Sequence, residues 1–106
     1  MRFMLLLVRS RGAPAVSTEG YDDALRRAGI LLAHDRLDRE GAAQVRAADG
    51  GARIVDAACE GVGAAVDGYW TIQARSRDEA IEWARRCPAG AGDAVEVHRL
   101  HDAGAT

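Results

Sequence analysis

The chain has 106 residues, 48% of them hydrophobic and 28% charged, and a formal net charge of −2. This composition is typical of one globular domain, and no apolar run approaches the roughly 20 residues that a membrane-spanning helix needs. The 14 basic residues are all arginines, scattered among 16 acidic residues. We therefore expect a soluble protein with neither nucleic acid nor a membrane as a partner, and the absence of lysine excludes Schiff-base chemistry.

The chain opens with an apolar run at 2–9 that is bounded by charges, which predicts a strand buried on both faces. Its apolar part, Phe3 to Val8, is shorter than the h-region of a signal peptide. Cys59 and Cys87 lie too far apart for a CxxC unit. We therefore expect reduced thiols and a cytoplasmic location.

A predicted helix follows the loop at 11–18. Ser17 or Thr18 is a suitable N-cap, and Gly29 is well placed to end the helix. The second apolar run, 30–37, predicts a second strand.

The middle of the chain predicts a β-hairpin. Two short stretches, 42–47 and 52–56, flank an Asp-Gly-Gly turn at 49–51, and Asp-Gly favours the positive φ angles of a tight turn. The Gly- and Ala-rich stretch 58–68 has no clear period and is predicted to be a loop.

The last third of the chain predicts a strand, a helix and a strand. The strand is expected at 69–74, and Ser76 to Glu79 form a capping box for the helix, which Pro88 ends. Cys87 shares a face of this helix with the core and is expected to be structural. The alternating stretch 94–100 is the last strand.

This order of elements predicts an α+β fold: a ferredoxin-like βαββ(β)βαβ sandwich with an inserted hairpin, as a single domain at 1–100 with a flexible tail at 101–106. Both helices would cover one face of an antiparallel sheet. A second protomer commonly covers the other face in such small domains, so we expect a homodimer of the dimeric α/β-barrel type with a cavity between the sheets.

Six stretches of the chain resemble the YCII-related family, in particular its DGPF branch. They are "RFMLLL", "LRRAGILLA", "DGG", "GYWTI", "DEAIEWARRCP" and "VEVHRL". The resemblance implies the same ferredoxin-like dimer. A few family members are similar to small enzymes that act on ring compounds, such as a dehydrochlorinase, in which a His and an Asp are implicated.

The chain departs from the family pattern at two places. "DAAC" at 56–59 stands where the branch has Asp-Gly-Pro-Phe, so that only Asp56 is kept. His34 and Asp35 stand where the family usually has Gly-Glu. The histidine is therefore a departure from the family pattern, whereas the acid is kept as a shorter one.

His34 is the candidate catalytic residue. On a regular strand His34 and Asp35 point to opposite faces, so they cannot form one dyad unless a β-bulge intervenes. Asp56 is therefore our choice of partner, and it would orient the ring of a general base. Arg36, on the same face as His34, would bind an anionic group of the substrate. The alternative is a histidine satisfied by the backbone and solvent.

Asp35, Tyr69, Trp70 and His98 are further candidates for ligand binding. Tyr69 and Trp70 face opposite sides of their strand, so one packs under the helices and the other faces the intersheet cavity. His98 and His101, three residues apart, would lie on opposite faces of a strand, so we expect no metal site.

Besides a purely structural interaction protein, which would have a filled space between the sheets, two functions remain open from these residues. One is a cofactor-independent lyase or isomerase in which His34 removes a proton from a small cyclic or carbonyl-bearing metabolite. The other is a non-catalytic module that uses the dimer cavity to hold a small ligand or a partner protein. The degenerate DGPF signature favours the second function, and His34 favours the first.

Overall fold

A computed structural model describes residues 1–10, 12–38, 40–56 and 64–102, with only the backbone described at 55, 56 and 64. Within these ranges the chain forms six strands and two helices. In chain order they are β1 (Arg2–Ser10), α1 (Glu19–Arg27), β2 (Leu31–Arg36), β3 (Ala43–Ala48), β4 (Gly51–Asp56), β5 (Ala64–Gln73), α2 (Arg77–Arg85) and β6 (Ala94–Arg99).

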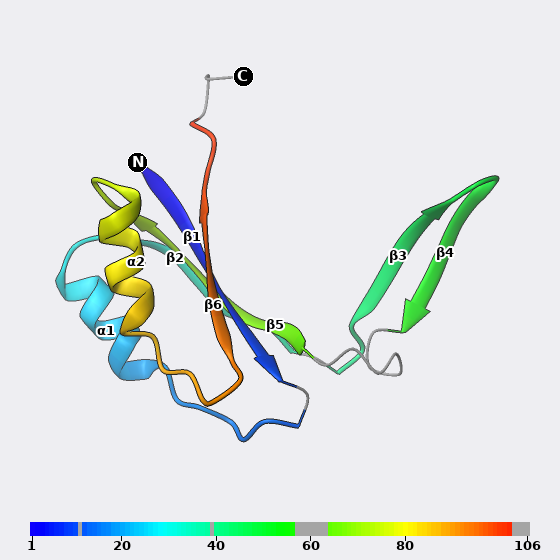
Figure 1. Cartoon of the computed structure of the whole chain (residues 1–106), viewed down its shortest axis with the longest axis horizontal. Coiled ribbons are helices and arrows are strands. Elements are labelled where there is room, and N and C mark those ends of the chain that lie inside the picture. Colours follow the sequence, from blue (N-terminus) through cyan, green and yellow to red (C-terminus); the bar gives the residue numbers. More distant parts are fainter. Residues whose placement is uncertain (11, 39, 57–63, 103–106) are drawn as a thin grey trace.

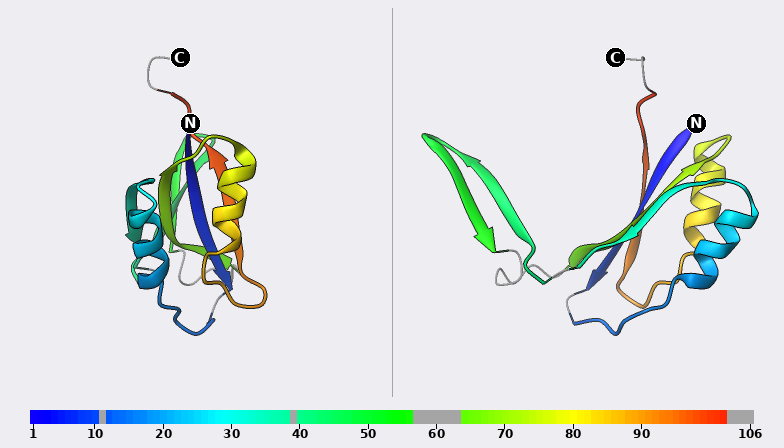
Figure 2. Two further views of the ribbon diagram at one scale, coloured as in Figure 1. Left: turned by 90° about the vertical axis from the view of Figure 1, so that its left-hand side faces the viewer. Right: turned by 180° about the vertical axis from the view of Figure 1, so that it is seen from behind.

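Four strands form an antiparallel sheet in the order β2-β5-β1-β6, and β3 and β4 form a separate two-stranded sheet. Figure 1 shows α1 and α2 together on one side of the four-stranded sheet, and the views in Figure 2 agree. This order and layering confirm the predicted ferredoxin-like α+β fold. None of the helices in these ranges is long and apolar enough to cross a membrane.

The core lies between the helices and the sheet. Along β1, Phe3, Leu5 and Leu7 are buried, whereas the residues between them are only half-buried. Trp70 on β5 lies opposite Leu5 and is completely buried. The alternation follows from the pleat of a strand, which sends successive side chains to opposite faces. The sheet therefore has one helix-covered face and one open face.

Two helix boundaries, the end of α1 and the start of α2, lie where the sequence predicts. Beyond α1, Gly29 has a positive φ of 73°, and the amide of Ile30 donates to the carbonyl of Leu25 in the manner of a Schellman motif. The Ser76 side chain accepts a hydrogen bond from the amide of Glu79, which confirms the N-terminal cap of α2.

Strand β5 begins earlier than predicted. The stretch Ala64 to Gly68, expected to be part of a loop, pairs with the end of β1 instead. Gly68 is buried beneath Arg36, and a Cβ atom there would lie 3.0 Å from Arg36 Cδ and 3.1 Å from the Asp35 carbonyl oxygen. Glycine at this position thus permits a close approach between strands. The Gly- and Ala-rich composition of the stretch does not by itself distinguish such a strand from a loop.

A β-bulge interrupts the pairing of β2 with β5 between Leu31 and Ala33. Leu32 is the extra residue, and its side chain is 53% exposed. Beyond the bulge, His34 pairs with Trp70 and Asp35 with Tyr69. The bulge precedes His34, so it does not bring His34 and Asp35 to the same face.

A buried ion pair ties β1 to the loop before β6. Arg9 Nε donates to Asp93 Oδ2 at 3.0 Å, and their side chains are 6% and 1% exposed. The amides of Gly90 and Ser10 also donate to the Asp93 carboxylate. The hydrogen bond from the Gly90 amide, followed by those from Arg9 and the Ser10 amide, holds the pKa of Asp93 below its ordinary value of 3.8.

We expect Asp93→Asn to lower the melting temperature at neutral pH. A carboxylate with a depressed pKa stabilises the fold above its unfolded-state pKa, and this stabilisation is lost as the pH falls through the folded-state value. The difference between wild type and variant should therefore shrink below pH 3.8, as measured by thermal denaturation across acidic pH. Asp23→Asn, which changes an exposed carboxylate, is the control. A difference that does not vary with pH would contradict this prediction.

Candidate functional site

His34 is held on three sides at the boundary between β2 and the helix layer. Its Nε2 lies 3.2 Å from Asp22 Oδ2, and its Nδ1 lies 3.0 Å from the carbonyl oxygen of Tyr69. The ring stacks on Trp70 with a centroid distance of 5.0 Å and an interplanar angle of 3°. The His34 side chain is 14% exposed. The ring is thus fixed in one orientation.

Asp22 is the centre of this cluster. Its Oδ1 accepts a hydrogen bond of 2.7 Å from the indole Nε1 of Trp70, and its Oδ2 accepts one of 3.3 Å from the hydroxyl of Thr18. With His34, the carboxylate is in contact with three polar groups while its side chain is only 11% exposed. A buried carboxylate is tolerated when donors surround it in this way.

The two neighbours of the His34 ring are both hydrogen-bond acceptors. The carbonyl oxygen of Tyr69 can only accept, so Nδ1 must carry a proton to bond to it. Nε2 then donates to the Asp22 carboxylate only when the ring is doubly protonated. In this arrangement neither ring nitrogen is directed at an incoming substrate.

The described contacts of His34 include a carboxylate that was not predicted, that of Asp22 on α1. Asp56, the predicted partner, ends β4 in the separate hairpin, and its side chain lies outside the described residues. The Asp22 contact arises because β2 packs beside α1, whereas the hairpin projects away from the sheet (Figure 1).

Asp35 lies on the opposite face of β2, as the alternation predicts. Its Oδ2 accepts a hydrogen bond of 2.8 Å from the hydroxyl of Tyr69, on the open face of the sheet. This hydrogen bond is the main cause of a raised pKa of Tyr69. Of the two predicted aromatic residues, Trp70 therefore packs under the helices and Tyr69 lies on the open face.

Arg36 is engaged by its own chain. Its guanidinium forms an ion pair with Asp67 and donates to the carbonyl oxygen of Val16 at 3.3 Å and to the hydroxyl of Thr18 at 3.5 Å. An anionic ligand would therefore have to compete with Asp67 for Arg36.

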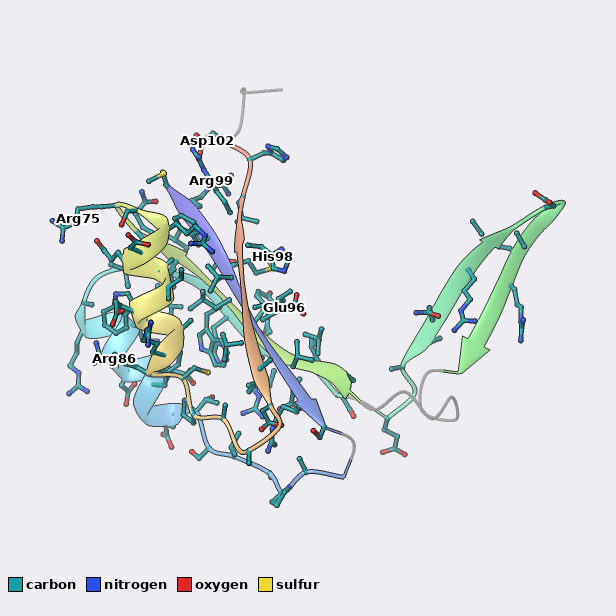
Figure 3. All side chains as sticks on the ribbon, in the orientation of Figure 1. Arg75, Arg86, Glu96, His98, Arg99 and Asp102 are labelled. Atoms are coloured by element: carbon teal, nitrogen blue, oxygen red, sulfur yellow. The ribbon has the colours of Figure 1, made fainter. Side chains whose placement is uncertain are left out.

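His98 lies on the open face, on edge strand β6. Its Nε2 lies 2.8 Å from Glu96 Oε1, and the two side chains are more than half exposed. Figure 3 shows both side chains on the side of β6 that faces away from the helices. No group of three or more potential metal ligands occurs within the described ranges.

A shallow groove of about 470 Å³ lies on the helix side, between the end of α1 and α2. Its charged residues already have partners: Arg75 pairs with Glu79, and Arg86 lies over the ring of Trp83 at 4.2 Å (Arg75 and Arg86 are labelled in Figure 3). The groove therefore offers little free polar chemistry for a ligand.

A comparison with protein-family models matches residues 1–102 to the YCII-related domain. The chain belongs to the YCII-related domain family. No curated protein matches the chain. Membership in the family confirms the predicted resemblance, and the match assigns no reaction.

Asp22 was not among the residues predicted from the sequence, although the sequence carries a signal for it. Thr18, Asp22 and Leu25 recur at helical spacing, and all three are buried in the structure. An acidic residue on the apolar stripe of a helix is expected to have a buried partner. The donor that it bonds most closely, Trp70, is 48 residues away in sequence, which local patterns cannot show.

We expect Asp22→Ala to lower the free energy of unfolding by roughly 3 to 5 kcal/mol, because three buried polar groups would lose their shared partner. Asp22→Asn should cost only about 1 to 2 kcal/mol, because its amide oxygen can accept from Trp70 while its NH2 group donates to a neutral His34. Urea denaturation followed by tryptophan fluorescence measures both. Asp23→Ala on the exposed side of α1 is the control. Equal losses in the two Asp22 variants would contradict this account.

We expect Asp35→Ala to lower the pKa of Tyr69 toward 10, because the hydrogen bond to Asp35 raises it. Tyrosinate absorbance during an alkaline titration measures this value. The other tyrosine, Tyr21, ionises at higher pH because burial raises its pKa. Glu96→Ala, a carboxylate on the far edge of the sheet, should leave the Tyr69 titration unchanged. An unchanged titration in Asp35→Ala would show that the hydrogen bond is absent in solution.

Proposed function

We propose that this protein is a homodimeric small-ligand-binding module whose site lies on the open face of the four-stranded sheet. One observation supports this proposal above the others: a row of paired residues, Asp35, Tyr69, Leu6 and Glu96, crosses the sheet on this face. Directly opposed residues of antiparallel strands share a face. The row therefore joins an apolar centre to polar groups at both edges.

The neighbouring row is also apolar at its centre but has a polar group at one edge only, because Ala33 ends it on β2. Met4 lies at its centre, opposite His98 on β6 and Thr71 on β5. Ligand sites are typically apolar with a few polar groups that fix orientation. The carboxylates of Asp35 and Glu96 suit a small ring compound that carries hydrogen-bond donors, with Tyr69 as a surface for its ring.

The dimer is part of the proposal because the open face is apolar at its centre. Leu6 and Val8 are only half-buried, and Val66 opposite Val8 is 36% exposed. Packing the open faces of two copies together would remove these side chains from water and enclose the ligand. A cytoplasmic location fits the same proposal, because Cys87 is a free, buried thiol whose pKa burial raises to about 11.

The second candidate is a cofactor-independent lyase or isomerase, and the His34–Asp22 pair is the observation that favours it. A carboxylate 3.2 Å from the ring orients the imidazole as catalysis requires. Proton removal by His34 would first require its Nε2 to turn from Asp22 to a substrate. Binding at the open face needs no such rearrangement, so we rank it first.

Native mass spectrometry of gently purified protein tests the proposal, because one spectrum reports subunit number and retained ligand together. We expect a dimer that carries a reproducible extra mass. Leu6→Glu should give a bare monomer, because it places a charge at the centre of the open face. The control is Arg77→Glu, an equally polar change on exposed α2. A wild-type monomer would contradict the dimer, and a bare wild-type dimer would contradict the ligand site.

His34→Ala separates the two candidate functions. Because His34 lies on the helix face, the variant should keep the extra mass if the open face binds the ligand. Loss of turnover of the identified ligand with retained binding would instead support the enzyme.

A further inference from the structure

The β3–β4 hairpin, here called the arm, is exposed over its whole described length. Every described side chain of its two strands is exposed, including Val45 at 65% and Ile54 at 75%. Figures 1 and 2 show the arm projecting away from the four-stranded sheet. Val45 and Ile54 are directly opposed across the arm. They form an apolar pair that nothing in the described chain covers.

The two faces of the arm differ in chemistry. The face of Val45 and Ile54 also carries three alanines, whereas the opposite face carries an Arg46–Arg53 pair. The described side chains of the first face are Ala43, Val45, Ala47, Ala52 and Ile54. This alternation of apolar and polar positions is typical of a sheet with one covered face.

The arm has little to stabilise it alone. An isolated two-stranded hairpin is marginally stable in water, and like charges directly opposite each other are unfavourable. Arg46 and Arg53 are such a pair, although Arg46 also donates a hydrogen bond to Gln44 on its own strand. Covering the apolar face would supply the missing stabilisation.

The position of the arm indicates what covers it. The arm stands on the side of the sheet away from the helices, the side toward which Glu96 and His98 point in Figure 3. This is the open face. A second copy bound to the open face would therefore lie beside the arm.

The area of the open face and of the arm also favours a second copy of the chain as the partner. Four strands about 4.8 Å apart and six residues long cover roughly 400 Å² on one face. One face of the arm adds roughly 200 Å². These are flat footprints, which are smaller than the accessible surface of about 800 Å² per partner that a stable interface buries, and the arm enlarges the footprint by about half.

We infer that the apolar face of the arm, centred on Val45 and Ile54, packs against the body of a second copy of this chain bound at the open face. Two-fold symmetry makes the contact reciprocal, so that each copy holds the other with its arm. The inference rests on the proposed dimer and adds to it the element that holds the dimer together.

The test uses the full-length double variant Val45→Thr with Ile54→Thr. Threonine keeps the β-branched shape that favours a strand but removes apolar surface from the arm. Because the contact is reciprocal, four apolar side chains change per dimer. We expect the dimer dissociation constant, measured by analytical ultracentrifugation, to rise about 100-fold or more. Gln44→Thr, on the opposite face of the arm, is the matched control and should leave the dissociation constant unchanged.

Hydrogen exchange of the arm amides provides an independent measurement on the unaltered protein. We expect these amides to be protected at concentrations where the dimer forms and to exchange rapidly on dilution to the monomer. Protection that persists in the monomer would show the arm folded onto its own chain, and rapid exchange within the dimer would show that the second copy does not cover the arm. Either result overturns the inference.

The two proposals fail separately. A wild-type protein that stays monomeric overturns the proposed dimer and the arm contact together. A wild-type dimer whose dissociation constant is unchanged in the threonine variant leaves the proposed dimer standing and overturns the arm contact alone.

Discussion

The hydrogen bond from the Trp70 indole to the Asp22 carboxylate is the interaction on which the arrangement of this domain depends. It joins the first turn of α1 to the centre of β5 at 2.7 Å, inside the core. The same carboxylate fixes His34, and the buried ring of Trp70 supports both His34 and Tyr21. A helix, two strands and three aromatic or heteroaromatic rings therefore share one polar anchor. Buried polar networks of this kind specify a unique arrangement as well as stabilising it.

This hydrogen bond lies on the helix side of the sheet, and the two faces of the sheet differ in their chemistry. His34 serves the helix side, where its ring nitrogens already have neighbours, whereas Asp35 reaches the open side and binds Tyr69. The open face keeps apolar side chains at its centre and titratable groups at its edges. The adjacent residues His34 and Asp35 thus belong to two different environments, each with its own chemistry.

The sequence predicted the fold well because its signals are local. The capping box at Ser76, the helix stop at Gly29 and the alternation of the strands depend on neighbouring residues, and each appears in the structure. The order of these elements predicted the overall topology, and the family resemblance implied the same fold. The start of β5 was missed because Gly68 is required by a close approach of Arg36, which only the tertiary structure reveals. The Asp22 contact of His34 was missed for the same reason, since Asp22 comes from a different element.

The bulge at Leu32 determines which residue of β2 belongs to which face. It takes up one extra residue, so that Ala33 still pairs with Thr71 and His34 with Trp70. A strand has a period of two, so the same sequence paired without a bulge would reverse every side chain beyond Leu31. Asp35 would then point toward the helices, and His34 would point to the open face beside Tyr69. An extra residue that a strand does not absorb in a bulge is therefore a route by which related chains can exchange the chemistry of the two faces while keeping the same fold.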